Sequence, residues 1–250
     1  VVTGVSKATE AKESPVAITL VNEKDLQSST STNIVDAISK LPGISSINTG
    51  AAISKPVIRG LGYNRVITLN DGFRQEGQQW GDEHGVEIDE AGVARVEILR
   101  GPVSLMYGSD AIAGVVNFLR HEPVTEGNVQ LNAMLNYQSN NNLISSSLFN
   151  AGNINGFNWH IRGSNKIAGD YQNRYDGKVW NSGYKEWNLS GGFGVSKSWG
   201  YSNISFSTFN QQIGFNEGAR DSSGNFIHDV KLNDSTFQPQ PVTKNDVRGY

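Results

Sequence analysis

The feature that most constrains this chain is a series of segments after residue 122 in which apolar and polar residues alternate. In NVQLNAMLNYQ (128–138), each odd-numbered residue from Val129 to Tyr137 is apolar or aromatic, and most residues between them are Asn or Gln. The segment 143–150 is ambiguous. The pattern recurs in three further segments, 156–164, 186–196 and, less regularly, 203–208. A period of two residues is that of a β-strand with two different faces, so this half of the chain is predicted to form an antiparallel sheet.

Alternation alone fits a soluble β-sandwich as well as a membrane barrel, and three further features favour the barrel. The runs are about as long as the 9–11 residues of a tilted membrane strand. Aromatic residues gather toward the ends of the runs, as in the girdles of outer-membrane barrels: Tyr137, Phe157, Trp187, Trp199 and Tyr201. The connections are unequal, as in such barrels: 153–155 and 198–200 are tight, and 166–185 and 213–245 are long and polar. A short loop at 139–142 falls on the side of the long connections and departs from this rule.

The composition excludes several classes of protein. The 250 residues carry a net charge of −3, which is too small to indicate a nucleic-acid partner. Cysteine is absent, so we expect neither a disulfide framework nor a cysteine-based zinc site. No run of about 18 apolar residues exists, so no transmembrane helix is expected. The sequence has no nucleophile elbow, phosphate loop or zinc-protease motif, so we do not expect an enzyme.

The first half of the chain mixes helix and strand signals. A short β-branched run, 16–21, predicts a strand, and Thr32 or Asn33 is placed to cap a helix that Pro42-Gly43 ends. The polar, glycine-rich segment 72–87 has no periodicity and predicts a loop. Three further segments read as strands: 56–60, 65–72 and 94–101.

The segment VEILRGPVSLMYGSDAIAGVVNF (96–118) places Glu97 and Arg100 in an apolar run. Burying two opposite charges is costly unless each finds a partner, so this segment is expected to lie against polar surroundings. The simpler interpretation is that both residues lie on the surface of a soluble domain and that Arg-Gly-Pro is an ordinary turn.

In order along the chain, five motifs occur: VVTG (1–4), LPGI (41–44), VIRG (57–60), the turn NDG (70–72) and the segment 96–118. With this set, the chain resembles a TonB-dependent outer-membrane receptor of Gram-negative bacteria. The resemblance implies an α+β plug domain in residues 1–122, followed in 123–250 by the first five to six antiparallel strands of a transmembrane β-barrel. Plugged barrels need about 22 strands, so we expect the chain to be the N-terminal part of a longer receptor, surrounded by outer-membrane lipid and completed by the remainder of the barrel.

The resemblance also implies roles for individual residues. Arg59, Glu97 and Arg100 would pair with the barrel wall. TonB would add to an N-terminal segment as an extra strand, and residues 1–3 (Val1, Val2 and Thr3) are either the end of that segment or the first residues of the plug.

The polar loops 60–65 and 72–85 are the candidate ligand surface. Arg65 and Arg74 suit an anionic ligand, Gln75 offers an amide, and Trp80 offers a flat stacking face. His84 is a further candidate contact. Asp82, Glu83 and His84 are also candidate metal ligands, although three adjacent residues do not easily converge on one ion, and a loop histidine is more often simply solvated.

These features predict a receptor that imports a metal chelate, such as a ferric siderophore, haem or a cobalamin-like compound, with energy delivered through TonB. The transported chelate is its ligand, and no intrinsic cofactor is expected. Glycan import is less favoured, because that branch of the family usually carries VVDG where this chain has LNDG (69–72). The alternative from another class is a secreted, soluble, β-rich carbohydrate-binding or adhesion module.

Overall fold

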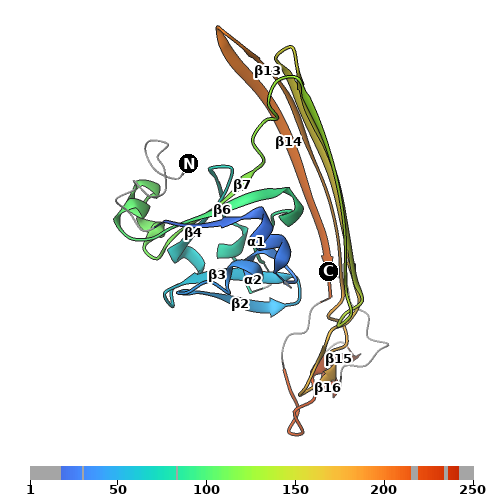
Figure 1. Cartoon of the computed structure of the whole chain (residues 1–250). Coiled ribbons are helices and arrows are strands. Elements are labelled where there is room, and N and C mark those ends of the chain that lie inside the picture. The colour runs from blue at the N-terminus through green and yellow to red at the C-terminus, as the bar shows by residue number, and fades with distance from the viewer. Residues whose placement is uncertain (1–17, 30, 83, 215–218, 234–235, 242–250) are drawn as a thin grey trace. The chain divides into compact units, whose positions relative to one another are not determined.

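The computed structural model describes residues 18–29, 31–82, 84–214, 219–233 and 236–241, and the chain divides into two compact units, Val1–Pro123 and Val124–Tyr250 (Figure 1). None of the helices in the described residues has the length and apolar character needed to cross a membrane. The elements of the first unit are β1 (Ile18–Asn22), α1 (Glu23–Ser28), α2 (Ile34–Ile38), β2 (Ile44–Gly50), β3 (Ile53–Ile58), β4 (Val66–Asn70), β5 (Phe73–Gln75), β6 (Val93–Leu99) and β7 (Gly114–Arg120). Short 3-10 turns lie between them: η1 (Tyr63–Arg65), η2 (Gly77–Gln79), η3 (Glu90–Gly92), η4 (Pro102–Tyr107) and η5 (Ser109–Ala111).

The first unit is an α+β domain built on a five-stranded sheet with the order β1-β6-β7-β4-β5. Strands β4 and β7 are parallel, and the other pairs in this sheet are antiparallel. Strands β2 and β3 form a separate antiparallel pair. The predicted strands are present, but four elements were not predicted from the sequence: α1, β2, β5 and β7.

Helix α2 begins where the sequence predicts, because the side chain of Asn33 accepts a hydrogen bond of 2.9 Å from the backbone N–H of Asp36. Its residues Ile34, Val35 and Ile38 are buried and belong to the same core cluster as Phe118 of β7. Burying this apolar face stabilises so short a helix, which would not persist in isolation.

The second unit contains one antiparallel sheet of five long strands in the order β14-β13-β10-β9-β8, followed in sequence by a two-stranded pair (Figure 1). The alternating segments form these strands as predicted, and the ambiguous segment 143–150 lies in β9. The sequence predicts five to six strands; the start of the sixth, which we place at 246–247, lies outside the described residues. The bounds are β8 (Asn128–Gln138), β9 (Leu143–Ile154), β10 (Phe157–Ala168), β11 (Gln172–Asn173), β12 (Gly177–Lys178), β13 (Tyr184–Lys197), β14 (Gly200–Ile213), β15 (Ile227–Asn233) and β16 (Thr236–Pro241).

The two faces of the long sheet have the reverse of the usual polarity. Along β9, buried and exposed residues alternate, with Ser145 and Ser147 buried and Ile144 and Leu148 more than half exposed. The exposed apolar set continues across the sheet: Leu131, Leu135, Ile161, Ile167, Trp187, Leu189 and Phe193. The buried set is mixed: it contains Leu143, Phe149 and Ala151, but also many polar or charged side chains, among them Arg162, Lys166, Glu186 and Asn188. Such a sheet presents its apolar side chains outward, as an outer-membrane barrel does.

Candidate functional site

The loop that follows β5 is held to the plug by a buried lysine. Lys55 of β3 is only 1% exposed, and its Nζ donates to the backbone carbonyls of Trp80, at 3.0 Å, and Gly81. The same ammonium lies 4.7 Å from the centre of the Tyr63 ring. A charge that is removed from water needs such partners, so these contacts hold the loop backbone in one place.

Asp82 joins the two polar loops that the sequence identified. Its carboxylate accepts a hydrogen bond of 3.0 Å from the Tyr63 hydroxyl, and its backbone carbonyl accepts one from the Thr49 hydroxyl. The hydrogen bond to Asp82 raises the pKa of Tyr63 above its usual value, because removing the phenol proton would place a second negative charge beside the carboxylate. Loops 60–65 and 72–85 therefore form one continuous surface.

Gln78 and Gly85 also attach the loop to the plug. The amide of Gln78 is buried; its Nε2 donates to the carbonyl of Val66 at 3.0 Å, and its Oε1 accepts from the hydroxyl of Thr68. At the end of the loop, a Cβ added to Gly85 would lie 2.9 Å from the backbone nitrogen of Ser54. Glycine is required at position 85 because the two backbones approach too closely for a side chain.

Arg74 is already engaged by two carboxylates of the plug. Its Nη2 lies 2.6 Å from Oδ2 of Asp110, and its Nε lies 3.0 Å from Oε1 of Glu76. The hydrogen bond from Arg74 lowers the pKa of Asp110 below its ordinary range. An anionic ligand that uses Arg74 would have to compete with these carboxylates.

The loop displays its aromatic residues to solvent. Trp80 is 67% exposed and Phe73 is 76% exposed, although the backbone beside Trp80 is clamped by Lys55. Gln75 is partly buried and pairs with Thr68 across β4 and β5. A rigid backbone with an exposed indole is a suitable stacking platform, because little conformational entropy is lost when a planar group binds.

The predicted metal ligands are not brought together in the described part of the chain. No group of three His, Cys, Asp or Glu side chains among those residues is arranged to hold an ion. His84 is exposed, and its Nδ1 lies 4.0 Å from Oε1 of Glu87. Asp82 is used by Tyr63, and Glu83 lies outside the described residues, so the metal site stays a prediction.

The charged residues of the 96–118 segment find polar partners inside the plug. Glu97 is fully buried, and its Oε1 lies 3.4 Å from Nε of Arg95. Arg100 donates from Nη1 to the carbonyl of Pro42 at 3.3 Å, and from Nη2 to the hydroxyl of Thr19. Burial and the charge of Glu97 raise the pKa of the nearby Tyr107 phenol.

Two arginines of the loop after β3 are exposed. Arg59 adopts a positive φ of 51° at the start of this loop, and Arg65 ends η1. The backbone carbonyl of Arg65 accepts a hydrogen bond from the N–H of Ala113 at 2.9 Å. Contacts of Arg59, Glu97 and Arg100 with a barrel wall stay a prediction.

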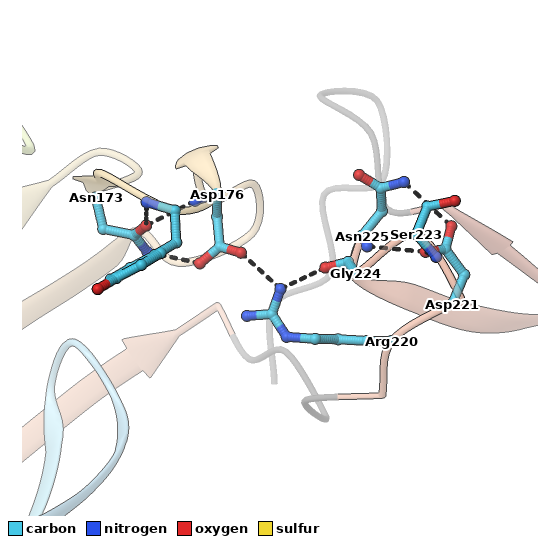
Figure 2. Close-up of polar contacts among 8 residues, drawn as sticks. Asn173, Asp176, Arg220, Asp221, Ser223, Gly224 and Asn225 are labelled. Carbon is cyan, nitrogen blue, oxygen red and sulfur yellow. Dashed lines mark hydrogen bonds and ion pairs between the residues drawn. The ribbon is translucent and has the colours of Figure 1, made fainter.

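A second polar cluster joins two long connections of the sheet unit (Figure 2). Nη1 of Arg220 donates to Oδ1 of Asp176 at 2.6 Å and to the carbonyl of Gly224 at 2.6 Å, while its guanidinium lies 3.8 Å from the Phe226 ring centre. The hydrogen bond from Arg220, followed by that from Asn173, lowers the pKa of Asp176. The connection after β10 and the connection after β14 are therefore tied to each other.

Sequence reasoning missed the residues that position the loop, chiefly Lys55, Gln78 and Asp110. The signal for Lys55 was present, because a lysine in the apolar run ISKPVI (53–58) raises the same question as Glu97 in its own strand. Asp110 lies far from Arg74 in sequence, and no local pattern predicts their pairing.

Comparison with protein families matches residues 10–115 to the TonB-dependent Receptor Plug Domain. An iron-regulated outer membrane virulence protein of Vibrio cholerae is 33% identical over 144 residues, covering 54% of this chain and 22% of that protein. A hemin receptor of Yersinia enterocolitica is 37% identical over 119 residues, covering 47% of this chain and 17% of that protein. The chain thus spans about a fifth of the length of these relatives.

Solved structures share the fold. The copper transporter OprC superposes with a TM-score of 0.69 at 21% identity, covering 82% of this chain and 32% of that one. The pyoverdine outer membrane receptor FpvA of Pseudomonas aeruginosa superposes with a TM-score of 0.63 at 18% identity, covering 80% of this chain and 28% of that one. The chain therefore carries a TonB-dependent receptor plug domain at residues 10–115, matched in sequence, and it shares the fold of its plug and sheet with solved outer-membrane receptors.

Proposed function

We propose that the receptor containing this chain imports a metal chelate across the outer membrane of a Gram-negative bacterium, with energy supplied through TonB. The observation that carries the proposal is the pairing, in one chain, of a plug domain with a sheet that exposes an apolar face and buries charged and polar side chains on the other. The names of the relatives, an iron-regulated outer membrane protein and a hemin receptor, favour an iron chelate or haem as the cargo. No catalytic step is assigned to the chain.

Within this function, residues 1–122 act as the plug and 123–250 as the first barrel strands, with lipid outside and the remaining strands completing the barrel. Outer-membrane fractionation separates this proposal from the secreted-module alternative. The receptor is expected to sediment with outer membranes and to need detergent for extraction, whereas a soluble module would stay in the supernatant.

The surface from Phe73 to His84, with Arg65 beside it, is the proposed chelate contact. Trp80 supplies the stacking face, and the clamp from Lys55 holds the loop backbone still. Arg74 and Gln75 supply donors, although Arg74 must first be released from Asp110 and Glu76. TonB would bind an N-terminal segment; Val1, Val2 and Thr3 lie outside the described residues.

The test is ligand titration of the full-length receptor in detergent with haem, a ferric catecholate siderophore and a ferric hydroxamate siderophore. Trp80→Ala is expected to weaken binding of the true ligand by about 1–3 kcal/mol, the range of binding hot spots. Phe157→Ala, an exposed aromatic of the sheet unit, is the matched control. A variant with Ala at Arg74, Gln75, Trp80 and His84 is compared with wild type. Equal binding would exclude this loop as the ligand surface and would assign the surface to the long connections of the sheet unit.

A further inference from the structure

Four polar side chains connect the beginning of the described plug to the segment by which the chain leaves it. Glu23 lies at the start of α1, directly after β1, and Arg95 lies in β6, opposite the last residue of β1 (Asn22). His121 and Glu122 follow β7 and precede the second unit. Residues 121–123 are called the exit segment below.

Arg95 bridges a buried carboxylate to the exit segment. Its Nε lies 3.4 Å from Oε1 of the fully buried Glu97, and its Nη1 donates to Oε1 of Glu122 at 3.2 Å. The register of β6 against β7 shifts between Val93 and Arg95, as in a β-bulge. A bulge changes the direction of the side chains beside it. Arg95 lies next to this register shift, and its side chain contacts Glu122, which follows β7.

His121 makes the second connection. Its Nε2 lies 3.0 Å from Oε2 of Glu23, and the imidazole is only about one-fifth exposed. The pair spans 98 residues of sequence, so it joins the first described helix directly to the exit segment. Together with the Arg95–Glu122 pair, it fastens both sides of the exit segment to the same corner of the plug.

We propose that Glu23, Arg95, His121 and Glu122 form a clasp of two side-chain pairs, which couples β1 and α1 to the exit segment so that displacement of one loosens the other. Glu97 keeps Arg95 in place, because a buried carboxylate without a partner is strongly destabilising. Arg95 is thereby held where it can contact Glu122. The mechanical use of the clasp rests on the proposed function: a pull on the chain before β1 would then be felt at the junction with the barrel strands.

The plug offers a matched control for these pairs. Arg120, the residue before His121, forms an ion pair of 2.9 Å with Asp71 after β4, and neither residue contacts β1 or α1 through this pair. Removing it tests whether the loss of any ion pair at this end of β7 has the same effect as opening the clasp.

Hydrogen exchange of the full-length receptor in detergent, without ligand or TonB, measures the coupling. The double variant His121→Ala, Glu122→Ala removes both contacts of the exit segment and leaves Arg95 paired with Glu97. Exchange in peptides covering 18–22 is expected to become about two- to fivefold faster, the scale of partly exposed ion pairs. In the reciprocal experiment, Glu23→Ala is expected to accelerate exchange at 119–123.

The Arg120→Gln control is expected to leave exchange at 18–22 unchanged. The clasp is refuted if the double variant speeds hydrogen exchange only in the exit segment. It is also refuted if the Arg120 control speeds exchange at 18–22 as much as the double variant does. Because neither ligand nor transport enters this measurement, a failure of the clasp is distinguishable from a failure of the proposed import function.

Discussion

The plug and the sheet unit differ in where they place their large apolar side chains. In the plug, most residues excluded from water are apolar, such as Ile58, Val66 and Phe118, and the buried charges Lys55 and Glu97 have partners. In the sheet unit, Leu131, Leu135 and Phe193 are exposed while Arg162 and Glu186 are buried. The same hydrophobic effect explains both arrangements if the plug is surrounded by water and polar groups and the outer face of the sheet by hydrocarbon.

The two units also differ in how charges are held. In the plug, the two buried charges are held at separate places: Lys55 donates to two backbone carbonyls, and Glu97 lies against Arg95. In the sheet, Glu186 forms an ion pair with Lys166 and accepts hydrogen bonds from the side-chain amides of Asn188 and Gln211. A network of this kind suits the hydrated inner wall of a barrel, where polar side chains from neighbouring strands lie side by side.

The largest predicted effect tests whether the exposed face of the sheet meets lipid. Leu148→Arg, in the middle of β9, is expected to destabilise the receptor in lipid vesicles by about 2–4 kcal/mol, because an arginine would enter hydrocarbon. Leu148→Ala controls for the loss of the leucine. The free energy of unfolding in denaturant measures both, and a change below about 0.5 kcal/mol for the arginine variant would mean that this face is bathed in water.

An intermediate effect is expected in the plug. Lys55→Met removes charge-assisted hydrogen bonds to the carbonyls of Trp80 and Gly81 and is predicted to cost about 1.5–3 kcal/mol. Protease cleavage within 76–86 should accelerate, because the loop loses its clamp. Lys40→Met is the control, since Lys40 is exposed and bonds the Ser29 hydroxyl at 2.8 Å; equal cleavage rates in the two variants would contradict the clamp.

The smallest effect compares the loop contacts of the two units. Hydrogen bonds from Arg74 and Arg220 lower the pKa values of Asp110 and Asp176 below their ordinary value of 3.8. Each pair therefore contributes stability above pH 3.8 and loses it as the pH falls through the lowered pKa of the folded state. Hydrogen exchange around Asp110 and around Asp176 should become faster only in this acid window. Asp110→Asn should abolish the increase around position 110 alone, and Asp176→Asn should abolish it around position 176 alone.

The sequence by itself determined the elements whose signals are local. Alternation predicted β8, β10 and β13 clearly and β14 less regularly, because a β-strand has a period of two whatever surrounds it, whereas the segment that forms β9 was ambiguous. Asn33 and the apolar spacing after it predicted where α2 begins, since the cap is a contact between neighbours in sequence. The run 94–101 was predicted as a strand, and the charges of Glu97 and Arg100 predicted polar surroundings for it, because an apolar environment tolerates charge poorly.

Only the tertiary structure decided which residues meet across long stretches of chain. Lys55 reaches Trp80, Arg74 reaches Asp110, and His121 reaches Glu23, and in each case the pairing depends on how β-strands far apart in sequence are ordered in the sheets. Strand order follows from the packing of all the strands together, so no single motif predicts it. The sequence identified the loop only as polar, whereas the structure adds that buried partners hold its backbone and that the Trp80 side chain is exposed.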